Sequence, residues 1–283
     1  MNRERLPYEL EASWKEKDMA GGETVDAQVL IMRTNGCCWA KAGNGGCTMC
    51  GYRSASLTGV TEEDLNKQID LALSKYKGEP FVKIYTSGSF FDTNEIPESI
   101  RERIFSEYSG CKRILVESRP EFLTSDLVST LPGTLTVALG MESSDEEVLR
   151  TCINKGFTAA QSKAAGELLK DGGIGVRTYL LLKPCLTEPR AIDGAVESAR
   201  FADPFSDEIS INPLNVQHAP VVERLWKRGE FRSPWIWSLI EVMKRLSGTV
   251  NSRIMSSPSG GGSQRGVHNC GKCDHDALAA IER

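Results

Sequence analysis

The stretch AQVLIMRTNGCCWAKAGNGGCTMCGY, residues 27–52, joins a short apolar run to a loop that carries four of the chain's nine cysteines. The run from Ala27 to Thr34 is rich in aliphatic residues and too short for an ordinary helix, which indicates a buried strand. The loop after it is rich in glycine as well as cysteine. The stretch therefore predicts a strand whose carboxyl end carries a group of thiols.

The same order of a short apolar strand and then a polar loop recurs along the chain. We expect six such strands, at residues 27–34, 81–86, 112–117, 134–139, 175–182 and 208–212. Segments of helical period lie between them. A capping box at Thr61–Asp64 opens one helix, and another begins near Thr158 and ends at Gly172-Gly173. Strands that alternate with helices are typical of βα units around a parallel sheet.

Polar, charged or glycine-containing residues follow the carboxyl end of every predicted strand. In parallel βα barrels the loops at that end build the active site. We therefore predict an α/β fold with an open partial (βα)6 barrel over residues 27–213. A short N-terminal arm, residues 1–26, would precede it, and a C-terminal extension, residues 214–283, would follow it.

Composition indicates a soluble globular protein. A hydrophobic content of 40% and a charged content of 25% are ordinary for that class, and no apolar run approaches the roughly 18 residues of a membrane span. The segment Met1–Pro7 has charges of both signs and lacks the apolar core of a secretory signal, so we expect a cytoplasmic protein. In a reducing compartment, clustered cysteines favour metal or redox chemistry over structural disulfides.

The net charge of the chain indicates how it can bind nucleic acid. The formal net charge of -4 argues against a protein that coats nucleic acid unaided, because Lys and Arg supply most non-specific affinity for phosphates. Residues 224–232, with Lys244, Arg245 and Arg253, combine cations and aromatics that suit contacts to phosphates and bases. A solvated charged face explains the same residues and is the interpretation that the sequence favours.

The spacing of the loop cysteines is C-x9-C-x2-C when Cys37 is counted first. A structural zinc site usually takes four ligands in two close pairs, and the first pair is missing here. Three thiolates on a glycine-rich loop suit a 4Fe-4S cluster that leaves one iron open to another ligand. We therefore predict Cys37, Cys47 and Cys50 as cluster ligands, with Cys38 as the alternative first ligand.

A second C-x2-C pair, Cys270 and Cys273, lies near the C-terminus between His268 and His275. This spacing suits zinc or a second cluster, with the histidines as further ligands. Two reduced thiols in a turn explain it equally well.

Other candidates follow the third and fifth strands. Glu117 and Arg119 form either an ion pair at the barrel rim or a surface that faces a charged ligand. Cys185 is a candidate for lining the pocket because it follows the fifth strand. Cys111 and Cys152 are expected to be small buried side chains without a role.

These motifs carry a family resemblance. A three-cysteine loop after the first strand of a six-unit barrel resembles the radical S-adenosylmethionine (SAM) superfamily, and the x9 gap is similar to that of its Elongator-type tRNA-modifying members. The chain more closely resembles the family of archaeosine synthase radical-SAM subunits (RaSEA). That resemblance spans nearly the whole chain and rests on the motifs Arg33–Trp39, Gly46–Tyr52, Glu117–Pro120, Ile153–Phe157, Asn212–Gln217, Pro234–Trp237 and Asn269–Cys273.

The resemblance implies where SAM binds. In this superfamily the amino and carboxylate groups of SAM chelate the open iron, and one-electron reduction yields a 5'-deoxyadenosyl radical. The family pattern assigns Ser87, Gly88 and Ser89 to the turn whose backbone meets the SAM amino group. It places Glu142 in contact with SAM, and Asn212 and Asn215 at the adenosine portion. No residue of this chain is assigned as catalytic.

The resemblance also implies a lyase of archaeal tRNA modification. Its substrate would be tRNA with a lysine-adducted 7-cyano-7-deazaguanine in the D-loop, made by an ArcS-type lysine transferase partner. Carbon-nitrogen cleavage would leave archaeosine, after an unidentified electron donor has reduced the cluster.

Two alternatives stay open: another radical SAM tRNA-modifying enzyme, and a non-catalytic zinc-binding module. An Elongator-type enzyme carries an acetyltransferase domain after the barrel, for which the remaining residues, about 70, are too few. A methylthiotransferase carries a second three-cysteine cluster before the barrel, and residues 1–36 contain no cysteine.

Overall fold

The computed structural model describes residues 5–43, 45–52, 56–218 and 221–281. The chain forms two compact units. The first holds residues 1–44, 52–138 and 168–175, and the second holds residues 45–51, 139–167 and 176–283. The chain therefore passes from one unit to the other inside the cysteine loop.

The first unit is built on a sheet whose strand order follows the chain. Its strands are β1 (Ala12–Ala20), β2 (Glu23–Ile31), β3 (Phe81–Tyr85), β4 (Arg113–Ser118) and the beginning of β5 (Leu135–Glu142). Strand β1 runs antiparallel to β2, whereas β2, β3 and β4 are parallel. The helices are α1 (Cys38–Lys41), α2 (Glu62–Lys75), α3 (Glu98–Glu107), η2 (Pro120–Phe122) and α4 (Ser125–Val128).

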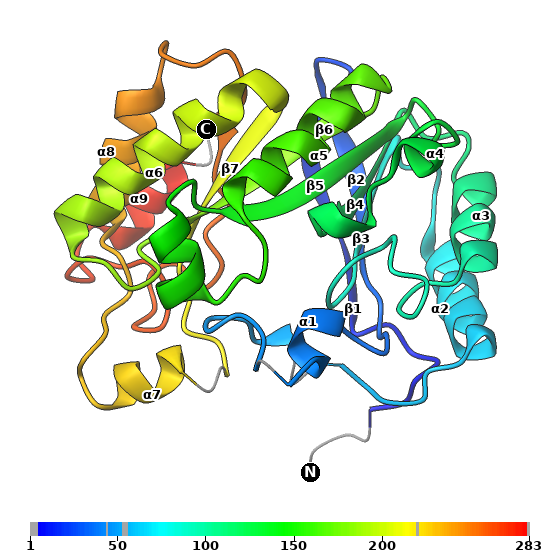
Figure 1. Cartoon of the computed structure of the whole chain (residues 1–283), viewed down its shortest axis with the longest axis horizontal. Helices are drawn as coiled ribbons and strands as arrows, with labels where there is room; N and C mark the ends of the chain where they lie inside the picture. The colour runs from blue at the N-terminus through cyan, green and yellow to red at the C-terminus, as the bar shows by residue number, and fades with distance from the viewer. Residues whose placement is uncertain (1–4, 44, 53–55, 219–220, 282–283) are drawn as a thin grey trace. The chain divides into compact units, whose positions relative to one another are not determined.

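Helix α2 shows why these segments fold as they do. The Thr61 hydroxyl accepts a hydrogen bond from the backbone N–H of Asp64, and the Asp64 carboxylate accepts one from the backbone N–H of Thr61, which confirms the predicted capping box. Leu65, Ile69 and Ala72 are spaced for one helical face, and all three are buried. Helices α2 and α3 lie side by side (Figure 1).

The second unit repeats the βα pattern. It contains the end of β5, β6 (Gly175–Leu182), β7 (Glu208–Pro213) and β8 (Arg253–Met255), and β6, β7 and β8 are parallel neighbours. Its helices are η3 (Val148–Ile153), most of α5 (Ala159–Asp171), α6 (Glu188–Ala202), η4 (Asp203–Phe205), α7 (Val222–Lys227), α8 (Ile236–Leu246) and α9 (Asp274–Ile281). Helix η3 is a π-helix.

The core of the second unit is formed by α6, α8 and the strands next to them. Ala191, Ala195 and Ala199 give α6 a buried face of small side chains, and Leu239 and Val242 of α8 belong to the same apolar cluster. Helices α6 and α8 lie side by side (Figure 1). Small side chains allow such elements to approach closely, and interiors pack densely.

The strand predictions are confirmed with small differences in their bounds. Strand β6 has the predicted bounds, and β3, β4, β5 and β7 differ by one to three residues at their ends. The first predicted strand begins four residues earlier than expected, at Glu23, because it pairs with β1.

Strands β1 and β8 were not predicted. The four consecutive charged residues Lys15–Asp18 interrupt the alternation of apolar and polar residues that would predict β1. Gly21 and Gly22, between β1 and β2, are nevertheless a strong hairpin signal. Both glycines have positive φ, 62° and 82°, as a two-residue hairpin turn requires. Strand β8 has only three residues, too few for a periodic pattern.

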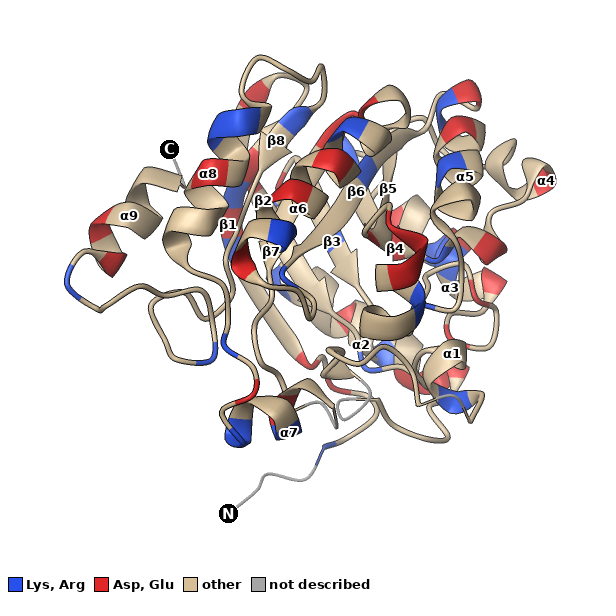
Figure 2. Ribbon diagram, turned by 60° about the vertical axis from the view of Figure 1, so that its left-hand side comes forward, with Lys and Arg blue, Asp and Glu red and all other residues tan. Residues whose placement is uncertain are grey.

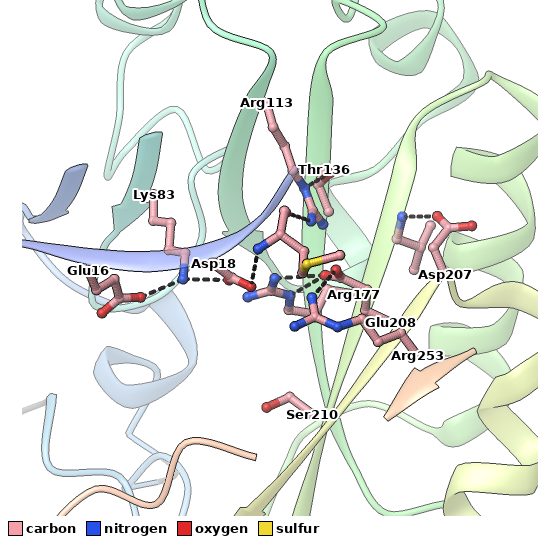
Figure 3. Close-up of polar contacts among 12 residues, drawn as sticks. Glu16, Asp18, Lys83, Arg113, Thr136, Arg177, Asp207, Glu208, Ser210 and Arg253 are labelled. Atoms are coloured by element: carbon pink, nitrogen blue, oxygen red, sulfur yellow. Dashed lines mark hydrogen bonds and ion pairs between the residues drawn. The ribbon is translucent and has the colours of Figure 1, made fainter. Parts of the chain in front are cut away.

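Each unit contains a group of buried charges that are paired (Figure 3). In the first unit, Lys83 lies 2.5 Å from Glu16 and 2.6 Å from Asp18. In the second, Glu208 lies 2.7 Å from Arg177 and 3.1 Å from Arg253. Pairing offsets the large cost of removing a charge from water, so these residues are accounted for by the fold.

Candidate functional site

The first half of the cysteine loop belongs to the first unit. Cys37 is the residue before α1, and Cys38 begins that helix. Gly36 has a φ of +89°, and a Cβ atom there would lie 2.2 Å from the Ser56 hydroxyl, so only glycine fits. Burial, and next to it the neighbouring Cys37, raise the pKa of the Cys38 thiol to about 11.

The second half of the loop belongs to the second unit, where hydrogen bonds hold it in place. The Thr48 backbone N–H donates to the Ile153 carbonyl at 2.9 Å, and its hydroxyl donates to the Cys152 carbonyl at 2.5 Å. The Asn154 side-chain amide donates to the Gly46 carbonyl at 2.8 Å. Cys47 and Met49 pack on the apolar cluster that includes Val148, Leu149 and Ile153.

The donor chemistry of the loop fits an iron-sulfur cluster. Cys37, Cys38, Cys47 and Cys50 carry thiols with partial solvent access, which cluster ligation needs. Within the described part of the chain, no three His, Cys, Asp or Glu side chains form a group arranged to hold a metal ion. The ligand assignment therefore remains a prediction from spacing and chemistry.

The turn Ser87–Ser89, predicted at SAM, lies against the first cysteine. A Cβ atom on Gly88 would lie 2.5 Å from the Cys37 Cα atom, so glycine allows the close approach of the two backbones. The backbone N–H groups of Ser87, Gly88 and Ser89 all donate to the Glu95 carboxylate, at 2.9, 3.0 and 2.7 Å. With these donors engaged, the turn would meet an ammonium group through its carbonyl oxygens.

Glu95 is a residue that the sequence did not reveal. It is 1% exposed and also accepts a hydrogen bond from the Thr34 hydroxyl at 2.6 Å. Burial raises the pKa of Glu95, while the Thr34 hydroxyl and the backbone N–H groups oppose that shift. Glu95 thus fixes the turn beside Cys37. The available signal was an acidic residue soon after a glycine turn.

Glu142 occupies an unusual position at the end of β5. Its φ is +68°, a conformation that non-glycine residues rarely adopt and that is frequent at functional sites. Its carboxylate accepts a hydrogen bond from Lys155 at 3.0 Å, and both side chains are largely buried. The Lys155 ammonium also lies over the Phe157 ring, 5.3 Å from its centroid.

A pocket of about 210 Å³ in the second unit has Glu142 in its wall. Ser143 and Asp145 continue that wall, and Arg190 and Ser198 of α6 line it as well. The lining supplies acceptors for hydroxyl or ammonium groups and one cation for a carboxylate.

The two asparagines assigned to adenosine lie at and after the end of β7, and both are partly exposed. The Asn212 amide oxygen accepts a hydrogen bond from the Ser210 hydroxyl at 2.9 Å. Asn215 lies next to the loop that contains Gly260. A Cβ atom on Gly260 would lie 3.1 Å from the side-chain nitrogen of Asn215. The loop that contains Gly260 therefore packs against a predicted site residue.

The second C-x2-C pair sits in a turn held by Asp274. The Asp274 carboxylate accepts from the backbone N–H groups of Asn269 and Gly271, at 2.9 and 3.0 Å. Cys270 is exposed and Cys273 partly so. No metal-binding group of three such side chains occurs there or elsewhere in the described ranges, so a second metal site remains a prediction.

Partners are defined for residues near the predicted rim, and the role of Glu117 and Arg119 stays a prediction. Arg119 pairs with Glu121 at 2.5 Å and lies over the Trp39 ring at 5.7 Å. Cys152 and Cys185 form a disulfide with Cα atoms 5.6 Å apart, so Cys152 is not a buried thiol without a role. The sequence could not reveal this bond because 33 residues separate its partners.

The predicted basic segment is largely paired. Lys227 lies 3.3 Å from Glu223, Arg228 lies 2.8 Å from Glu230, and Arg245 bonds both Asp193 and Glu241. Basic and acidic residues are interspersed along the ribbons of α6 and α8 (Figure 2). This arrangement supports the solvated charged face.

Comparison with known proteins decides the family. The chain is 38% identical over 283 residues to archaeosine synthase subunit beta of Methanosarcina acetivorans, covering 95% of this chain and 81% of that protein. The chain belongs to this family. Its relation to the Elongator-type proteins is more distant, and no protein-family model matches it.

Solved structures confirm the fold class. Elp3 of Methanocaldococcus infernus superposes with a TM-score of 0.53 at 18% identity, covering 76% of this chain and 57% of that one. The radical SAM methyltransferase TsrM of Kitasatospora setae gives 0.53 at 15% identity, covering 71% of this chain and 39% of that one. The chain thus has an α/β fold similar to that of these two structures. Across the described residues, no helix is long and apolar enough to cross a membrane.

Proposed function

We propose that this protein is the radical SAM subunit of archaeosine synthase, a lyase that acts in archaeal tRNA modification. The observation that carries the proposal is its 38% identity to a subunit of that enzyme across 95% of the chain. The local structure supports it, because the glycine turn assigned to SAM touches the backbone of the first predicted cluster ligand.

Cys37, Cys47 and Cys50 would hold the 4Fe-4S cluster through their thiols. When bound, the cluster and SAM supply a 5'-deoxyadenosyl radical, which the side chains of the protein cannot generate alone. The role of this chain is to bind, to orient and to limit which hydrogen the radical meets.

Several side chains are suited to hold SAM. The carbonyl oxygens of the Ser87–Ser89 turn are acceptors for its amino group, since Glu95 occupies the N–H groups. The Glu142 carboxylate, fixed by Lys155, accepts hydrogen bonds from hydroxyl groups. The amides of Asn212 and Asn215 can both donate to and accept from an adenine edge.

The substrate would be a tRNA whose D-loop carries a lysine adduct of 7-cyano-7-deazaguanine. Cleavage of the carbon-nitrogen bond of the adduct leaves the amidine of archaeosine on the tRNA. An ArcS-type lysine transferase would be the partner, working with this subunit in the cytoplasm. The paired cations of this chain fit a division of labour in which the partner provides much of the grip on tRNA.

The chain would be organised as a barrel over residues 27–213, with residues 1–26 as its arm and residues 214–283 as its extension.

Cys270 and Cys273 would take zinc or a second cluster, since both are free and accessible. Metal analysis of a variant with both changed to alanine tests this site, and unchanged metal content contradicts it.

The activity is tested with anaerobically reconstituted protein, SAM, a reductant, the partner transferase and adducted tRNA. Mass spectrometry of digested tRNA should detect archaeosine, and chromatography should detect 5'-deoxyadenosine. A Cys47→Ala variant should form neither product. Wild-type protein that carries a cluster and forms neither product contradicts the proposal.

Metal analysis tests the zinc-binding alternative, and product analysis tests the other radical SAM alternative. A zinc module would bind zinc at the loop and show no electron paramagnetic resonance (EPR) signal that changes on addition of SAM. A different radical SAM tRNA modifier would cleave SAM and leave the lysine adduct intact.

A further inference from the structure

Four consecutive residues, Cys152–Lys155, contact both the second half of the cysteine loop and Glu142. Cys152 and Ile153 accept hydrogen bonds from Thr48, and Asn154 donates one to Gly46. Lys155 donates to Glu142. One short segment therefore holds two features that the proposed function places at the cluster and at SAM.

The end of η3 explains why this segment can accept hydrogen bonds. The last carbonyl groups of a helix lack partners within the helix and must find donors elsewhere. Cys152 and Ile153 are the last residues of η3, and Thr48 supplies two donors to their carbonyl oxygens. The loop is thus the cap of this π-helix, a helix type that is frequent at functional sites.

Asn154 follows η3 in the left-handed conformation, with φ 56° and ψ 53°. Asparagine tolerates this conformation better than other non-glycine residues. Its side-chain amide then reaches the carbonyl of Gly46, 108 residues away in sequence and buried. Asn154 therefore has two roles: its backbone turns the chain after η3, and its side-chain amide donates a hydrogen bond to the cysteine loop.

The bonds from Asn154 and Thr48 flank one predicted cluster ligand. Gly46 is fixed on one side of Cys47 and Thr48 on the other. Two fixed neighbours restrict the backbone dihedral angles of Cys47 and hence the direction of its thiol. A preorganised ligand loses less conformational entropy when it binds.

We propose that Asn154 is a positioning residue that orients Cys47 for the cluster through the Gly46 carbonyl. This inference rests on the proposed function, because it assumes that Cys47 is a ligand. It predicts that loss of the Asn154 amide weakens cluster retention without unfolding the protein.

The decisive variant is Asn154→Gly, because glycine keeps the left-handed conformation and removes only the amide. After anaerobic reconstitution, iron loss to a chelator should be about fivefold faster than in wild type, as expected for one lost hydrogen bond. The EPR signal of the reduced cluster, with and without SAM, should also change, which a purely structural role would not cause. Thermal unfolding of the cluster-free protein should remain cooperative, with a midpoint only a few degrees below that of wild type, because one hydrogen bond is lost there too.

Two further variants sharpen the test. Thr48→Val removes the hydroxyl donor while preserving shape, so it should act in the same direction and serves if Asn154→Gly does not fold. Asn251→Gly removes an exposed amide bonded to Asp203 in the same unit and should leave iron loss unchanged.

The outcomes separate this inference from the proposed function. If wild type binds a cluster that Cys47→Ala loses, but the Asn154→Gly and Thr48→Val variants retain iron as wild type does, the inference is wrong and the function stands. If wild type binds no SAM-responsive cluster, the proposed function itself fails.

Discussion

Replacing Glu95 by glutamine tests whether this buried carboxylate fixes the turn beside Cys37. One carboxylate oxygen accepts from the Thr34 hydroxyl and from the N–H groups of Ser87 and Gly88, and the other accepts from Ser89. A glutamine can keep its oxygen where three donors converge. Its NH2 group then faces the N–H of Ser89, so a donor meets a donor.

The size of the effect follows from that geometry. A buried N–H without an acceptor costs about 1–3 kcal/mol, and hydrogen bonds to a neutral acceptor are weaker than those to a charged one. The neutral amide costs less to bury than the carboxylate, which offsets part of this loss. We expect Glu95→Gln to lower the free energy of unfolding by about 2 kcal/mol.

Urea unfolding followed by circular dichroism at neutral pH measures this change. Glu102→Gln, at an exposed position of α3, is the matched control and should stay within about 0.5 kcal/mol of wild type. If Glu95→Gln changes stability no more than this control does, the carboxylate does not hold the turn as argued.

Three more predictions follow from the site and its surroundings. Gly88→Ala should lower the free energy of unfolding by about 1–3 kcal/mol in urea, because its Cβ atom would lie 2.5 Å from a backbone atom, whereas Gly110→Ala, with open space around it, should not. Lys155→Met should cost about 2 kcal/mol by the same measurement, because the largely buried Glu142 loses its cation; stability equal to wild type would contradict the pairing. Burial alone would raise the pKa of Glu188, but its hydrogen bonds hold that pKa below the ordinary value of 4.5. A depressed pKa in the folded state adds stability above pH 4.5 that is lost as the pH falls, so the advantage of wild type over Glu188→Gln should shrink between about pH 6 and about pH 3, and an advantage independent of pH would refute this.

The sequence predicted the strands well because their signal is local. Short apolar runs such as 175–182 are bounded by glycine and polar residues, and the capping box at Thr61 needs only four adjacent residues. Strand β1 was not predicted because charged residues interrupt its alternation of apolar and polar residues. Local patterns thus predict those helices and strands that bury one regularly spaced apolar face.

The supports of the site were not predictable in the same way. The bond from Asn154 to Gly46 spans 108 residues, and the pairing of the basic segment depends partly on residues such as Asp193, 52 positions from Arg245. Glu95 lies six to eight residues from the turn Ser87–Ser89 but 61 residues from Thr34, and nothing local shows that the chain brings these partners together. Cysteine spacing identified candidate ligands, whereas the residues that orient them depend on the tertiary fold.

The hairpin formed by β1 and β2 affects how the protein behaves when it is truncated. Strand β1 is the edge of its sheet and carries the charged run Lys15–Asp18, and charges on edge strands discourage pairing with other molecules. Removal of β1 would give the edge to β2, whose segment Ala27–Ile31 is uncharged and ends in three consecutive aliphatic residues. Strand β1 therefore protects the sheet edge against aggregation. A chain that lacks β1 should form insoluble protein, even though it keeps every predicted cluster ligand.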